Sequence, residues 1–115
     1  MSLRTPEQLA RSGTTPTFSA ADVAGDRFAN DGRTMVRFKN TNASARTVTF
    51  AIPITVDGQA VAGKQLTVPA TTGDVTTDVF PPEYNNTLGE VSWTYSTITD
   101  VTVAVYRASK VPGGQ

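Results

Sequence analysis

The chain has 115 residues, the size of a single domain with one hydrophobic core. Ten Lys and Arg side chains balance ten Asp and Glu side chains, so no net charge attracts nucleic acid or an acidic membrane. The chain has no Cys and no His, which excludes disulfides, thiolate nucleophiles, imidazole bases and Cys/His zinc sites. We therefore expect a protein without enzymatic activity, cofactor or metal. No apolar run is long enough to cross a bilayer and no apolar signal core is present, so we expect a soluble chain outside the classical secretory route.

Residues 1–14 form the one candidate for a helix. Thr5 can cap a helix, Pro6 suits its first turn, Gln8 completes a capping box, and Gly13 can end it. So short a helix is marginal in isolation. We expect a short N-terminal arm or helix that must dock on something, for which a neighbouring subunit is one candidate.

Residues 15–109 alternate between apolar and polar side chains, which predicts strands. A strand near residues 17–20 precedes a polar loop over residues 22–32, which Phe28 should pin to the core. The next strand turns Val36 and Phe38 inward. The clearest strand follows, with an inward face made of Val48, Phe50, Ile52, Ile54 and Val56. Pro53 cannot donate a ladder hydrogen bond, so this strand should lie at a sheet edge or carry a bulge.

Turn residues divide the second half of the chain into short strands. Asp57 and Gly58 suit either a tight turn or the start of a longer loop. Short strands are expected near residues 66–68 and 75–79, followed by a stiff proline-containing loop over residues 81–89. Residues 91–95 and 101–106 should pair as an antiparallel hairpin. Residues 110–115 should be a flexible C-terminal tail.

These elements predict an all-β fold: an antiparallel β-sandwich or jelly roll of about seven to eight strands. Abundant Thr and Val, whose branched side chains favour strands, agree with this class. Trp93 is expected in the core.

Several partial matches to known motifs fail in their spacing or their structural context. Gly58, Gly63 and Lys64 match most of a phosphate-binding loop, but Gln65 replaces the hydroxyl residue and a strand follows in place of a helix. The acidic residues between positions 22 and 31 lack the ligand spacing of a calcium loop. Basic residues are spread along the chain, which speaks against nucleic-acid binding.

Five segments resemble a known family. They are residues 18–33, residues 46–49, residues 55–62, the FPP motif at 80–82 with Tyr84 and Asn85, and residues 99–107. Together they are similar to small β-sandwich capsid decoration proteins, or cement proteins, of tailed bacteriophages. The resemblance implies a virion protein, assembled in the host cytoplasm, that binds the outside of the head and braces major capsid protein subunits, often as a homotrimer. It implies no catalytic residue, nucleic acid or membrane.

Two segments are predicted to bind these partners. In the arm, Leu3, Arg4 and Leu9 cannot be buried by the arm alone. In the stiff loop, Pro81, Pro82 and Tyr84 lower the ordering cost of binding. Two alternatives stay open: a carbohydrate-binding module that stacks sugars on aromatic side chains, and another virion component such as a head-fibre base or tail protein. The aromatic platform would consist of Trp93, Tyr95 and Tyr106.

Overall fold

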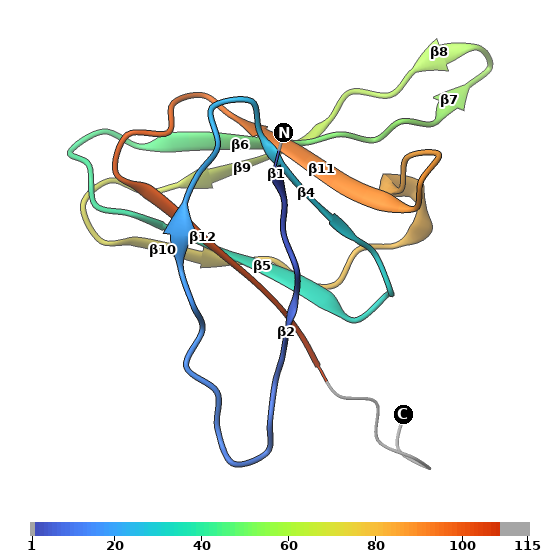
Figure 1. Ribbon diagram of the computed structural model, residues 1–115. Helices are drawn as coiled ribbons and strands as arrows, with labels where there is room; N and C mark the ends of the chain where they lie inside the picture. Colours follow the sequence, from blue (N-terminus) through green and yellow to red (C-terminus); the bar gives the residue numbers. More distant parts are fainter. Residues whose placement is uncertain (1, 109–115) are drawn as a thin grey trace.

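The computed structural model describes residues 2–108, so the tail predicted for residues 110–115 lies outside the described residues. These residues form an all-β fold of two mixed five-stranded sheets and a small separate hairpin (Figure 1). The only helical element in this part of the chain is a single 3-10 turn, η1 (Pro82–Tyr84). The all-β class predicted from the alternation is confirmed.

The first sheet has the order β1-β4-β11-β6-β9. Its strands are β1 (Ser2–Leu3), β4 (Asp26–Ala29), β11 (Glu90–Tyr95), β6 (Arg46–Phe50) and β9 (Lys64–Val68). The second sheet has the order β10-β5-β12-β2, and β3 also pairs with β12. Its strands are β10 (Gly73–Thr76), β5 (Thr34–Asn40), β12 (Val101–Arg107), β2 (Glu7–Gln8) and β3 (Ser19–Ala20). The hairpin consists of β7 (Thr55–Val56) and β8 (Gln59–Ala60).

Side chains of one parity from each sheet meet in a single core. The first sheet contributes Phe28, Val48, Phe50, Val91 and Trp93, and the second contributes Val36, Phe38, Val103 and Val105. The rings of Phe38 and Trp93 meet edge-on across the sheets, with centroids 5.9 Å apart. Aromatic pairs in this geometry add to the free energy gained from burial alone. Trp93 is buried at the centre of this cluster, as predicted.

The predicted N-terminal helix is wrong, because the arm forms two short strands instead. β1 pairs with β4 and β2 pairs with β12, both in parallel, so neither sheet is purely antiparallel as expected. The open edges of β4 and β12 offer backbone partners that a short isolated helix would not gain. Pro6, which lacks an N–H group, lies between the two strands where the chain crosses from one sheet to the other.

The long strand predicted over residues 47–56 ends at Phe50. β6 lies between β11 and β9, so it is neither at an edge nor bulged at Pro53. An interior strand needs N–H donors on both sides, which a proline cannot supply. The apolar side chains that alternate beyond Phe50 therefore do not face the core. Ile54, just before β7, and Val56, in β7, are exposed.

The predicted hairpin of residues 91–95 and 101–106 is also wrong. β11 belongs to the first sheet and β12 to the second. The connection between them is held at both ends, because Ser96 N–H donates to Thr47 O (2.8 Å) and Thr41 N–H donates to Asp100 O (3.1 Å). Period-two alternation reports which face of a strand is buried but not which sheet the strand joins.

The polar segment over residues 22–32 contains a strand that was expected to be loop. In β4 the buried positions alternate, with Asp26 and Phe28 both facing inward. The prediction that Phe28 anchors this segment to the core is confirmed. The strand was missed because its other buried residue is an aspartate.

The aromatic core predicts a large loss of stability on truncation of Phe38, whose ring touches those of Phe50, Trp93 and Tyr95. Phe38→Ala should lower the free energy of unfolding by about 3–5 kcal/mol. Urea denaturation followed by Trp fluorescence measures this. Val23→Ala is the matched control, since Val23 is exposed and its truncation should change stability by less than about 0.5 kcal/mol. Equal effects of the two substitutions would contradict this core.

Candidate functional site

The N-terminal arm closes one side of the fold by binding to both sheets. β1 pairs alongside β4 at the edge of the first sheet, and β2 pairs alongside β12 in the second (Figure 1). Backbone hydrogen bonds extend this attachment at both ends, from Arg4 N–H to Arg27 O (2.7 Å) and from Leu9 N–H to Arg107 O (3.0 Å). The arm is thereby an integral part of its own domain.

Arg4 fixes the arm through a buried ion pair. Its Nε lies 2.7 Å from Oδ1 of Asp26, whose side chain is fully buried in β4. The same guanidinium donates to the Ser19 hydroxyl and to the carbonyl oxygen of Ala20 (2.7 Å). Because the fork of donors is rigid, one side chain joins the arm, β3 and β4.

The second carboxylate oxygen of Asp26 connects this ion pair to the core. It accepts a hydrogen bond from the Tyr95 hydroxyl, which in turn accepts one from Trp93 Nε1 at 2.9 Å. Burial, together with the hydrogen bond to Asp26, raises the pKa of Tyr95 well above its ordinary value. Each polar group in this chain of contacts has a partner, as buried polar groups require.

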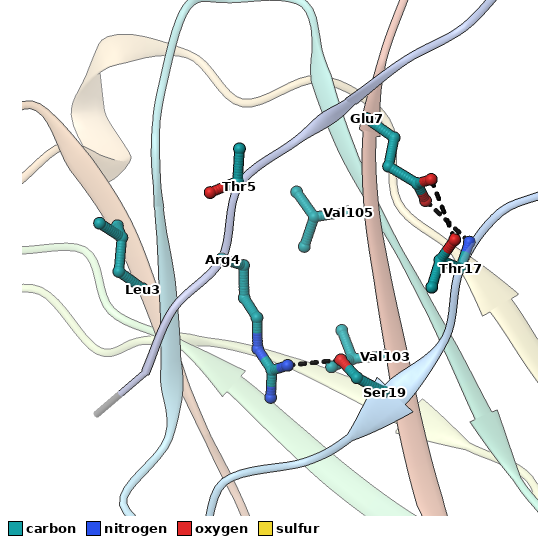
Figure 2. A pocket seen from close by; sticks show the side chains of 8 residues that line it. All are labelled: Leu3, Arg4, Thr5, Glu7, Thr17, Ser19, Val103 and Val105. Atoms are coloured by element: carbon teal, nitrogen blue, oxygen red, sulfur yellow. Dashed lines mark hydrogen bonds between the residues drawn. The ribbon is translucent and has the colours of Figure 1, made fainter.

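A recess of about 390 Å³ lies beside the arm, and we call it the arm recess (Figure 2). Val103 and Val105 of β12 line it together with residues of the arm and of the segment before β3. Its charged side chains are held by neighbours. Glu7 accepts hydrogen bonds from Thr17 N–H (2.7 Å) and from the Thr17 hydroxyl (3.1 Å), and Arg4 points to Ser19 (Figure 2). The arm recess is therefore a site where polar groups stabilise the fold.

A second recess, of about 300 Å³, is apolar, and we call it the apolar recess. It lies where edge strand β9 meets the segment between β10 and η1. Its apolar lining consists of Phe50, Leu66, Val79, Phe80, Pro81 and Tyr84. The rings of Phe80 and Tyr84 pack at 72° with centroids 5.2 Å apart, and Val79 is 42% exposed. Lys64 and Asp78 add one charge of each sign.

The β7–β8 hairpin projects away from both sheets (Figure 1). Its turn has positive φ at Asp57 (51°) and at Gly58 (75°), as a two-residue turn joining twisted strands requires. The tight turn is thus the correct one of the two alternatives considered for these residues. Ile54 and Val56 on this hairpin are 40% and 59% exposed.

Gly63 fixes the direction in which the hairpin leaves the sheet. A Cβ atom there would lie 2.7 Å from the Phe50 carbonyl oxygen and 2.8 Å from Thr49 Cγ2. The backbone after β8 can approach β6 this closely only because Gly63 has no side chain.

The residues predicted to bind partners lie in two separate places. In the arm, the Leu3 side chain is 56% exposed, Arg4 points inward to Asp26, and Leu9 is half-buried. In the loop, Pro81 and Tyr84 line the apolar recess, and Pro82 is exposed at the start of η1.

Sequence reasoning missed Asp26 and the hairpin as functional elements. The signal for Asp26 was its alternation with Phe28, which places both side chains on one face of a strand. The signal for the hairpin was Pro53 followed by Asp57 and Gly58, since a strand cannot continue through a proline into a tight turn.

The rejected motifs have structural roles. Gly58 sits in the hairpin turn and Lys64 begins β9, so a strand follows this near-match to a phosphate-binding loop, as expected. Among residues 2–108, no three acidic side chains gather closely enough to hold a metal ion. Nor does this part of the chain contain a helix that could cross a membrane.

The aromatic platform of the carbohydrate-binding alternative is not exposed as a unit. Trp93 is buried in the core, and its indole N–H is bonded to Tyr95. Stacking of a sugar needs a free ring face. Comparison of the chain with protein-family models, curated proteins and solved structures finds no match.

The Arg4–Asp26 pair predicts a strong effect of removing one partner. Arg4→Met should lower the free energy of unfolding by about 3–5 kcal/mol, because it leaves a buried carboxylate without its cation. Arg37→Met is the matched control: its pair with Asp74 (2.6 Å) is partly exposed, and its loss should cost about 0.2–1 kcal/mol. Urea denaturation of both variants measures the difference. Similar values for the two would show that Arg4 does not fix the arm.

The raised pKa of Tyr95 predicts a specific alkaline titration. The stability contributed by this group is complete below the unfolded-state pKa of about 10 and decreases as the pH rises above it. In the folded protein, the phenolate absorbance of the wild type and of Tyr95→Phe should therefore agree up to about pH 11. If the folded wild type shows a phenolate signal below this pH that folded Tyr95→Phe does not show, the buried hydrogen bond of Tyr95 is contradicted.

Proposed function

We propose that this protein is a capsid decoration protein: a β-sandwich that binds the outside of a phage head and stabilises it by bridging major capsid protein subunits. The observation that carries the proposal is the contrast between polar side chains that bond within the fold and apolar side chains that remain exposed. The Asp26 carboxylate and the Tyr95 hydroxyl are engaged in contacts inside the fold, whereas the aliphatic side chains of Leu3, Val56 and Val79 are exposed. Exposed apolar groups of this kind favour protein contacts.

The resemblance to decoration proteins supports the same function. Its five segments extend over most of the chain, and they consist of strand and turn residues. In the structure these segments build β4, β6, the hairpin, the apolar recess and β12, which are parts of the framework and its projections. A protein that acts by bracing needs this rigidity and several contact points.

Attachment to the head through several weak contacts is the proposed mechanism. A protein that touches a capsid at more than one point gains from the high effective concentration of the second contact once the first has formed. The exposed face of the arm at Leu3 is one proposed contact with the capsid. Arg4 is not part of this proposed contact, because its guanidinium is paired with Asp26.

Binding to heads assembled without this protein tests the proposal. Sedimentation of such heads with the purified protein should carry the protein into the pellet, to a saturable stoichiometry. Leu3→Asp should reduce the bound amount several-fold, since a carboxylate would be desolvated at an apolar contact. Deletion of the arm is a poorer test, because removing Arg4 also leaves Asp26 unpaired.

Val23→Asp is the matched control, because Val23 is exposed (79%) in the loop before β4, and this variant should bind heads as the wild type does. If the wild-type protein fails to sediment with either immature or mature heads, it is not a decoration protein. If Leu3→Asp binds as well as the wild type, the arm face is not a contact.

A further inference from the structure

The β7–β8 hairpin carries apolar side chains that nothing in residues 2–108 covers. All residues from 53 to 60 are exposed, among them Ile54 and Val56. A two-stranded hairpin is marginally stable in water unless its apolar face packs against something. The hairpin has the geometry of a two-residue turn and so presents these side chains at the end of a defined projection.

The apolar recess is a hollow of matching character on the same chain. Phe50, Phe80 and Tyr84 supply aromatic walls, and Leu66 and Val79 add aliphatic surface. Edge strand β9 borders it, with no further strand beyond it among the described residues. An apolar hollow at a sheet edge can accept both side chains and backbone of an incoming strand.

The hairpin of one molecule cannot fill the recess of the same molecule. The hairpin leaves the sheet after Phe50 and returns at Lys64, and both of these residues line the recess. Its root therefore lies beside the recess, and its tip extends away from the fold (Figure 1). An occupant has to come from a different molecule.

We propose that this occupant is the β7–β8 hairpin of a second copy of the chain, with Ile54 and Val56 entering the apolar recess. The charges agree with this pairing. Asp57 at the hairpin tip is the only charged residue between positions 51 and 63. Lys64 at the recess has no ion-pair partner within the described residues and can meet the incoming Asp57. In this arrangement Pro81 and Tyr84, which line the recess and were predicted to bind a partner, contact a neighbouring copy.

This contact uses two different surfaces of each molecule. Every copy offers one hairpin and one recess, so the copies can join as a reciprocal pair, as a closed ring or as an open chain. The inference does not depend on capsid binding, because both surfaces belong to this chain. Self-association of the purified protein can therefore be measured without any capsid.

Complementation between two variants tests the contact. Val56→Asp damages the hairpin and leaves the recess intact, and Val79→Asp damages the recess and leaves the hairpin intact. Both sites are exposed, so neither substitution removes core packing. Each should raise the dissociation constant of self-association at least about 30-fold, as loss of a central apolar contact does. Val23→Asp, at a more exposed site outside both surfaces, should associate as the wild type does.

An equimolar mixture of Val56→Asp and Val79→Asp should form a one-to-one complex, because the first supplies an intact recess and the second an intact hairpin. Light scattering of each protein and of the mixture distinguishes the outcomes. A wild-type protein that stays monomeric at its highest soluble concentration would overturn the proposal. So would variants that still associate, or a mixture that contains only monomers.

Cross-linking gives a second readout that does not rely on the strength of the contact. The chain has no cysteine, so a mixture of Val56→Cys and Val79→Cys, carrying tags of different size, can form a mixed disulfide only between molecules. Oxidation should give this mixed product in clear excess over a mixture of Val56→Cys with Val23→Cys. Equal yields from the two mixtures would contradict insertion of the hairpin into the recess.

Discussion

The buried carboxylate of Asp26 is the constraint on which the closed form of this fold depends. A charge without water must be compensated by partners, and Asp26 receives the Arg4 guanidinium on one oxygen and the Tyr95 hydroxyl on the other. Since Arg4 belongs to the arm and Tyr95 to β11, satisfying one carboxylate holds the arm to the centre of the first sheet. The pairing of β2 with β12 then carries the arm onto the second sheet.

This arrangement separates the polar interior from the surfaces available for binding. The ionic and hydroxyl groups near the arm are directed at one another, so they serve stability. The exposed large apolar side chains are directed outward: Ile54 and Val56 lie on the hairpin segment, Val79 at the apolar recess and Leu3 on the outer side of the arm. Such a division is what the proposed role in binding other proteins requires.

The sequence predicted the class of the fold and the composition of its core, because side-chain alternation directly reports which face of a strand is buried. Val36, Phe38, Val48, Phe50 and Trp93 all lie where that alternation put them. It could not assign strands to sheets, so β11 and β12 were wrongly joined. It also could not foresee the arm: Thr5 and Pro6 favour a helix locally, and the open edges of distant strands overrode that preference. Asp26 was missed for a related reason, since its partner Arg4 is brought to it only by the folded chain.

The candidate surfaces were predicted only in part. Proline stiffness predicted a binding surface in this loop, and Pro81 and Tyr84 line the apolar recess. The same alternation that located the core misplaced Ile54 and Val56 inside it, because an apolar face that stays exposed has the same pattern in the sequence as one that is buried. Only Pro53, which ends the ladder, distinguishes the two cases.

Pairing of β2 with β12 joins an early segment of the chain with one that is translated much later. Glu7 and Gln8 leave the ribosome 99 residues ahead of their respective partners Tyr106 and Arg107. Until β12 emerges, a nascent chain can place β1 beside β4 but has no second sheet edge to receive the rest of the arm. Long-range contacts of this kind form late and slow the folding of all-β proteins. The domain is therefore completed only after translation has passed residue 107, and a truncated product would expose the unpaired edge of β5 to other chains.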